Sequence, residues 1–177
     1  PAQRVEDGAL PFDRRRHGMI MGMGAVGLMI ERDEDVRARG AVPLAEFLSG
    51  CTVNSAFHGT RLDVEHIARE VQGVVQQACE KEGISAQAMA QRAMFMSHET
   101  YTPARGGSAA AEIAALRAAF GPAANQVIVS NTKGFTGHAM GAGLEDAIVV
   151  KALQTGKVPP VPNLREPDPD LGDLRLS

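Results

Sequence analysis

Short apolar runs that alternate with helix-forming stretches are the feature of this sequence that most restricts its fold. Residues 93–96 and 126–130 are apolar, brief and bounded by polar loops, which predicts two buried strands. Helices are predicted over 63–82, 108–120 and 140–155. Strands alternating with helices predict an α/β layered fold, in which helices flank a mixed, partly parallel sheet.

Capping signals define two of the helices. Asp63 and the apolar spacing that follows it predict the start of the long helix, and Gly83 suits the position that ends it. Ser85 is placed to cap a short second helix through Gln91.

The first third of the chain predicts further strands. The glycine-rich apolar run over 18–31 predicts one or two buried strands with a bend at Gly22 and Gly24. Residues 33–39 predict a short charged helix, and 42–52 another strand.

The chain is expected to form one partial domain over residues 1–177. Its tail, 157–177, holds five of the ten prolines and is expected to be extended. The last four residues, 174–177, have the pattern of a strand that is only beginning.

The composition excludes several classes of protein. With 44% hydrophobic and 22% charged residues, the chain has enough apolar material for a packed core. A net charge of −3, one Tyr and no Trp argue against nucleic acid or an anionic membrane as a partner. The apolar run over 19–30 is too short and too rich in glycine to span a membrane.

Cysteine and histidine usage points to a cytoplasmic protein without a metal. Cys51 and Cys79 are too few for a disulfide framework, which fits a reducing compartment. The five histidines are scattered, and neither CxxC nor HExxH spacing occurs. The polar N-terminal residues do not resemble a signal peptide.

Two loops follow the predicted strands over 93–96 and 126–130, where sites of α/β folds occur. In the second loop, Lys133 and His138 lie five residues apart between glycines, and a helix is expected to begin just after His138. The helix dipole there would disfavour the imidazolium, so His138 could donate a hydrogen bond to a developing oxyanion or enolate.

The first loop contains His98, Thr100 and Thr102. Alternate residues of an extended segment share a face, so these three side chains are expected to line one side of a groove. Two hydroxyl groups there could bind an amide-rich linker.

These motifs in this order resemble the β-ketoacyl synthases of fatty acid and polyketide biosynthesis. The resemblance rests on HxTxT at 98–102, on KxxxGH at 133–138, and on the Gly/Ala-rich helix that follows. Pro11-Phe12-Asp13 with Arg16 and Gly18, and Val158-Pro159-Pro160 with Asn163, add to it. It covers about residues 11–171 and implies the C-terminal half of a thiolase-like fold.

The resemblance implies a decarboxylative Claisen condensation and a role for each motif residue. His98 and His138 would polarise the malonyl thioester carbonyl and stabilise the enolate. Lys133 would orient His98, with Glu112 as its acidic partner. Thr100 and Thr102 would contact phosphopantetheine.

The same resemblance implies the partners. Substrates would arrive on the phosphopantetheine of an acyl carrier protein, with no cofactor bound by this chain itself. The N-terminal half of the synthase would complete the domain, which would form a homodimer.

Three features depart from the family pattern. Glu99 and Tyr101 replace the two glycines of HGTGT and could narrow the groove. Met23 replaces a glutamate between Gly22 and Gly24, and the loop after Thr102 is longer than usual.

The nucleophilic cysteine of the family is expected before Pro11. Cys51 and Cys79 are interpreted as structural thiols, since neither precedes an apolar helix whose N-terminus could lower a thiol pKa. The chain is therefore expected to be part of a larger synthase and inactive alone.

His58-Gly59-Thr60 resembles the active-site motif but is placed too early in the chain. It is interpreted as a loop, with Thr60 or Asp63 capping the next helix. Two other functions stay open: a non-catalytic ketosynthase-like partner that binds a carrier protein or sets chain length, and a thiolase-like enzyme using coenzyme A thioesters.

Overall fold

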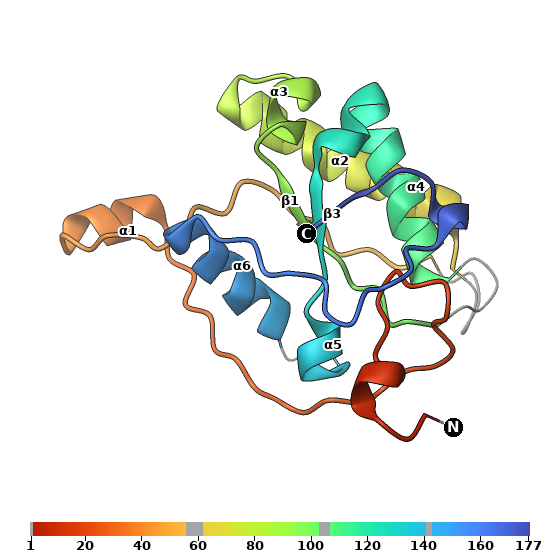
Figure 1. The fold of residues 1–177 in the computed structure, drawn as a ribbon. Coiled ribbons are helices and arrows are strands. Elements are labelled where there is room, and N and C mark those ends of the chain that lie inside the picture. Colours follow the sequence, from red (N-terminus) through yellow and green to blue (C-terminus); the bar gives the residue numbers. More distant parts are fainter. Residues whose placement is uncertain (1, 56–61, 103–106, 141–142) are drawn as a thin grey trace.

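Three parallel strands form the sheet of the structure, a computed structural model that describes residues 2–55, 62–102, 107–140 and 143–177. The sheet order is β1-β2-β3 (Figure 1). The strands are β1 (Met94–Met96), β2 (Ile128–Ser130) and β3 (Arg175–Leu176). All ladder pairs are parallel, and an antiparallel contact occurs at the isolated bridge between Asp13 and Pro167.

The register of β1 and β2 makes the two strands end level with each other. Met96 lies opposite Ser130, and the amide of Ser97 donates to the carbonyl of Ser130 at 2.8 Å. The loops that follow the two strands therefore leave the sheet side by side, as predicted for parallel strands.

The helices match most of the sequence-based expectations. Their bounds are α1 (Asp33–Ala38), α2 (Val64–Glu82), α3 (Ala86–Ala90), α4 (Ser108–Phe120), α5 (Lys133–Thr136) and α6 (Leu144–Thr155), with short 3-10 helices η1 (Val5–Asp7), η2 (Gly121–Gln126) and η3 (Pro169–Leu171). The predicted caps are confirmed: Asp63 accepts from His66 N at 3.0 Å, and Ser85 accepts from Ala88 N at 3.1 Å. Gly83 ends α2 with φ of 64°.

Helix α4 packs on α2 and supplies much of the core. Its buried face consists largely of alanine, with Ile113, Leu116 and Phe120 as the larger side chains. Small side chains let two helices approach closely. Val127 and Val129 belong to the same buried cluster as these side chains, so this helical layer packs against β2.

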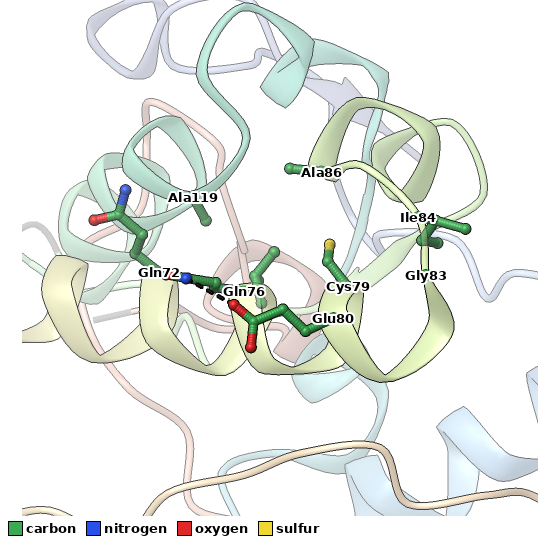
Figure 2. A pocket seen from close by; sticks show the side chains of 9 residues that line it. Gln72, Gln76, Cys79, Glu80, Gly83, Ile84, Ala86 and Ala119 are labelled. Atoms are coloured by element: carbon green, nitrogen blue, oxygen red, sulfur yellow. Dashed lines mark hydrogen bonds between the residues drawn. The ribbon is translucent and has the colours of Figure 1, made fainter.

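An open groove of about 370 Å³ lies on the outer side of this helical layer, between α2, α3 and α4 (Figure 2). Cys79 lines it, and burial raises the pKa of this thiol. No residue of the 97–102 or 131–138 loops is among those that line the groove. Cys79 therefore belongs to the helical layer, and its structural role stays a prediction.

The buried carboxylate of Asp13 joins the first residues of the chain to its tail. It accepts from the backbone amides of Arg165 and Glu166, both at 3.0 Å, and from the backbone and guanidinium of Arg15. Next to it, Arg14 N donates to Glu166 O and Asp168 N donates to Phe12 O, both at 2.9 Å. Segments about 150 residues apart are thus held together beside the sheet.

Two strand predictions are wrong. Residues 18–31 form no strand beyond an isolated bridge between Met21 and His138, and 42–52 form none. Met23 is 97% exposed and Val42 87% exposed. A strand requires a neighbour that pairs with its backbone, and the described residues provide these segments with one bridge only.

Two helix boundaries also differ from the prediction. The loop expected over 131–139 contains the short helix α5, and the last long helix begins at Leu144 rather than at Met140. Residues 141–142 between them lie outside the described residues. The tail is irregular except for η3 and β3, in agreement with the prediction of a strand at its end.

Asp13→Asn is expected to lower the free energy of unfolding by roughly 2–4 kcal/mol, because an amide cannot accept all of these hydrogen bonds. Its donors hold the pKa of Asp13 well below its usual range. The stabilisation is therefore present above the unfolded-state pKa and is lost as the pH falls. Urea unfolding at pH 7 and pH 3 measures this, and a loss as large in the exposed control Asp173→Asn would contradict it.

Candidate active site

The two predicted histidines meet beyond the ends of β1 and β2. The ring centroids of His98 and His138 lie 5.0 Å apart, with the planes at 83° in an edge-to-face arrangement. His98 follows β1 directly, and His138 follows β2 through α5. Forty residues of sequence separate them, and the level strand ends bring them together.

His138 is held by its backbone rather than by a helix N-terminus. Its amide donates to Ile20 O at 2.8 Å, and its carbonyl accepts from Gly22 N at 2.9 Å. A Cβ at Gly22 would lie 2.0 Å from Thr136 O, so only glycine allows this approach. Since α6 begins six residues later, at Leu144, the predicted effect of the helix dipole on His138 does not apply.

Glu112 fixes the start of the first loop. Its carboxylate accepts from His98 N at 2.8 Å and from the hydroxyl of Ser97. Burial raises the pKa of Glu112 to about 7, against the lowering effect of these hydrogen bonds. The predicted pairing of Glu112 with Lys133 is not a direct ion pair: the carboxylate of Glu112 is hydrogen-bonded to the His98 loop, and the charge of Lys133 acts on it by lowering its pKa.

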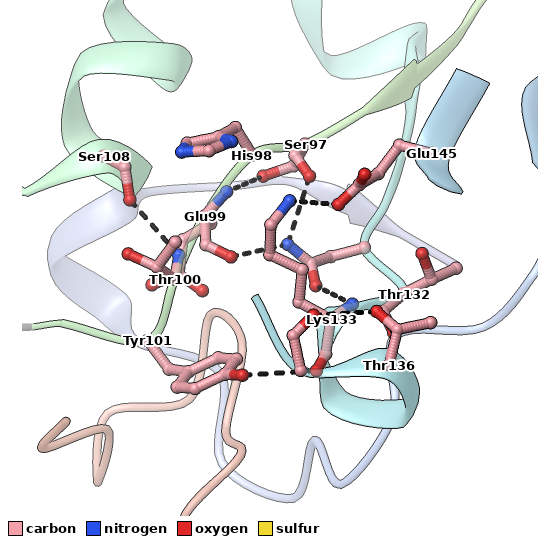
Figure 3. Close-up of polar contacts among 12 residues, drawn as sticks. Ser97, His98, Glu99, Thr100, Tyr101, Ser108, Thr132, Lys133, Thr136 and Glu145 are labelled. Carbon is pink, nitrogen blue, oxygen red and sulfur yellow. Dashed lines mark hydrogen bonds and ion pairs between the residues drawn. The ribbon is translucent and has the colours of Figure 1, made fainter. Parts of the chain in front are cut away.

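Lys133 pairs with Glu145, in the first turn of α6. The ammonium group donates to Glu145 Oε1, and the Lys133 side chain is only 2% exposed (Figure 3). Burial raises the pKa of Glu145, but the hydrogen bond from Lys133, a backbone hydrogen bond and the positive charge of Lys133 together outweigh it and hold this pKa below its usual value.

The environment of His98 favours its neutral imidazole. Partial burial lowers the pKa of His98, and the positive charge of Lys133 and the neighbouring His138 lower it further. The negative charge of Glu145 opposes this effect. A neutral ring can donate one N–H to an oxygen atom without carrying a charge itself.

Asn131 joins the two loops. Its amide donates to the carbonyls of Ser97 and Glu99, at 3.2 and 2.8 Å, and its Oδ1 accepts from Lys133 N at 2.8 Å. Asn131 and Glu145 were missed from the sequence. An acidic residue in the first turn of a helix was the available signal for Glu145.

Thr100 and Thr102 lie on one face of the first loop, as predicted. Their hydroxyl oxygens are 3.3 Å apart, and Thr100 N donates to Ser108 Oγ at 3.3 Å. The residues between Thr102 and Gly107 lie outside those described, so the far end of the predicted groove is not described.

The two side chains that replace family glycines turn inward rather than into the groove. Glu99 and Tyr101 are both fully buried (Figure 3). Glu99 faces Arg16, with Oε1 3.8 Å from Nε, and neither carboxylate oxygen has a hydrogen-bond partner among the described residues. Burial raises the pKa of Glu99 to about 7, although Arg16 lowers it.

The other residues considered from the sequence, Cys51, His58 and Thr60, are not among those described around His98 and His138. Cys51 is exposed in an irregular segment, without the strand-to-helix elbow of a nucleophile. His58 and Thr60 lie outside the described residues. Among the residues that are described, no group of His, Cys, Asp and Glu could hold a metal ion, and no helix is long and apolar enough to cross a membrane.

Comparisons with known proteins agree with this fold. Residues 46–165 match the family model of the beta-ketoacyl synthase C-terminal domain. The chain is 33% identical to 3-oxoacyl-[acyl-carrier-protein] synthase 2 of Synechocystis sp. over 90% of its length, and 32% identical to an oxytetracycline polyketide beta-ketoacyl synthase of Streptomyces rimosus over 93%. It spans 37% of the length of each.

Solved structures give the same result. A ketosynthase/chain length factor of ishigamide biosynthesis aligns with a TM-score of 0.78 at 31% identity, covering 96% of this chain and 40% of that one. A type II polyketide ketosynthase in complex with its acyl-carrier protein aligns at 0.79 and 25%, covering 99% and 41%. The fold is that of a thiolase-like condensing enzyme. The chain belongs to the β-ketoacyl synthase family and corresponds to its C-terminal part.

Glu99→Gln is expected to raise the free energy of unfolding, relative to the wild type, more at pH 8 than at pH 5. Because the folded-state pKa of Glu99 is raised, its contribution is complete below the unfolded-state pKa and is lost as the pH rises through about 7. The variant should gain about 1–3 kcal/mol in free energy of unfolding over this range, relative to the wild type. Urea unfolding at both pH values measures it. The exposed Glu82→Gln is the control, and an equal gain there would contradict the assignment.

Proposed function

We propose that this chain is part of a cytoplasmic β-ketoacyl-acyl carrier protein synthase that catalyses decarboxylative Claisen condensation in fatty acid or polyketide biosynthesis. The observation that carries the proposal is the edge-to-face pair of His98 and His138, placed beside the buried Lys133–Glu145 ion pair. Family membership agrees with it, and the whole-protein activity is an inference because the chain spans only part of its relatives.

In the proposed reaction, the malonyl carboxylate leaves as CO₂ and its bond electrons pass into the thioester as an enolate. Hydrogen bonds from His98 and His138 to the thioester oxygen would stabilise the negative charge that develops there. The enolate carbon then attacks an acyl-cysteine thioester, a carbon–carbon bond forms, and the cysteine thiolate leaves.

The surrounding groups keep both donors in place. Glu112 fixes the backbone of His98, and Gly22 and Ile20 fix the backbone of His138. Lys133 adds positive charge close to His98, which favours the neutral donor form of that ring. Because donors fixed in advance need little reorganisation when charge develops, such an arrangement suits enolate formation.

Substrate delivery would involve an acyl carrier protein, as the name of one structural neighbour states for that protein. Thr100 and Thr102, whose hydroxyl oxygens lie 3.3 Å apart, would bind the amides of phosphopantetheine, the carrier's own prosthetic group. No cofactor of the chain's own enters the proposal. Neither Cys51 nor Cys79 adjoins the histidine pair through any contact among the described residues, so the acylated cysteine is expected to belong to the N-terminal half.

The exposed apolar segments support a role for that half as a partner. Met29 is 85% exposed, and other large apolar side chains of 19–30 and 42–53 are also exposed to water. Contiguous exposed apolar surface marks an interface. We expect the N-terminal half to cover it, in a domain that forms a homodimer.

His138→Ala in the complete synthase is expected to lower malonyl-carrier decarboxylation by about 10²–10³-fold, since it removes one donor to the developing oxyanion. His98→Ala should give a comparable loss. Steady-state release of CO₂ measures both. His17→Ala, an exposed histidine, is the matched control and should retain activity. Full activity of His138→Ala would falsify the assigned role.

Met29→Glu is expected to weaken association between this chain and a separately produced N-terminal half, because it places a charge in the proposed interface. A loss of at least about tenfold in affinity is expected, with the exposed Lys151→Glu as control. Isothermal calorimetry measures it, and equal affinities for both variants would contradict the proposed surface.

A non-catalytic role is the second candidate, since one structural neighbour is described as a ketosynthase/chain length factor. It predicts that the complete protein binds a carrier protein and forms no carbon–carbon bond. Formation of the β-ketoacyl product by the acylated protein separates the two functions.

A further inference from the structure

Tyr101 occupies a position where the related motif has glycine, and its side chain reaches the second histidine loop. The residue is fully buried and has φ of 50°, a conformation that favours glycine. A tyrosine that holds this conformation needs contacts that compensate for the strain.

The hydroxyl of Tyr101 lies within hydrogen-bond distance of two carbonyl oxygens. It is 3.2 Å from Lys133 O, a contact that Figure 3 draws as a dashed line, and 3.3 Å from Ile20 O. The hydroxyl has one proton, so it donates to one carbonyl at a time or shares the proton between them. Burial raises the pKa of Tyr101, which keeps the hydroxyl protonated at neutral pH.

Both carbonyls also hold the backbone at His138. Lys133 O accepts from Gly137 N at 2.8 Å, and Ile20 O accepts from His138 N at 2.8 Å. The hydroxyl therefore contacts the acceptors of two consecutive amides, one of which belongs to His138 itself. Tyr101 also belongs to the same loop as His98, three residues further along.

We propose that Tyr101 is a positioning residue that fixes His138 relative to His98, through the carbonyls of Lys133 and Ile20. This inference rests on the proposed function for the role of the two histidines. In this proposal, Tyr101 does not touch the substrate. It acts by keeping the two loops in register, which a glycine at the same position cannot do.

Kinetics of malonyl-carrier decarboxylation by the complete synthase test the proposal. Tyr101→Phe keeps the ring and removes the hydroxyl, and it should lower kcat about tenfold with little change in KM, because misplaced donors reduce transition-state stabilisation. In a His138→Ala background, the same substitution should change kcat less than about twofold. Ser130→Ala, which removes another buried hydroxyl that donates to a carbonyl, is the matched control.

An equal loss from Tyr101→Phe in both backgrounds would overturn the proposal, since the hydroxyl would then act independently of His138. If Tyr101→Phe does not fold, Tyr101→Gly gives the same comparison with a residue suited to the positive φ. If His138→Ala alone leaves decarboxylation unchanged, the proposed function fails. The positioning is then decided by imidazole NMR, where Tyr101→Phe must shift the His138 ring signals, and unshifted signals overturn the proposal.

Discussion

The parallel pairing of β1 with β2 is the interaction on which the rest of the site depends. Its register makes the strands end level, and the hydrogen bond from Ser97 to Ser130 extends the ladder into the loops. Asn131, in the loop after β2, then donates hydrogen bonds to the carbonyls of Ser97 and Glu99 in the loop after β1. A slip of one residue would turn each side chain to the opposite face of the sheet. His98 and His138 would then no longer meet.

Buried charge defines the surroundings of the histidines. Glu112 and Glu145 divide two tasks between them: Glu112 anchors the backbone of His98, and Glu145 neutralises Lys133. Asp13 performs a comparable structural task at the junction of the first residues with the tail. Each carboxylate is stabilised by specific donors, because an unpaired ion in the interior would be costly. Glu99, whose nearest cation is 3.8 Å away, has the weakest pairing, and burial raises its pKa to about 7, as it does for Glu112.

Sequence reasoning named the residues that meet in the candidate site but not all of their partners. Helical spacing and caps located α2, α3 and α4 closely, because such signals are local. The strands predicted over 18–31 and 42–52 were wrong because an apolar run reports a tendency to be buried, while a strand also needs a neighbour. The partner of Lys133 depended on how α6 approaches the sheet, which the sequence does not encode locally.

The sequence by itself determined the family, the α/β class and the two histidine loops, since these follow from local motifs and their order. Only the tertiary structure decided that Lys133 pairs with Glu145, and that Glu99 and Tyr101 turn inward rather than narrow the groove. Which way a side chain points, and which charge it meets, depends on packing between segments far apart in the chain. Local sequence patterns carry no information on how such distant segments pack.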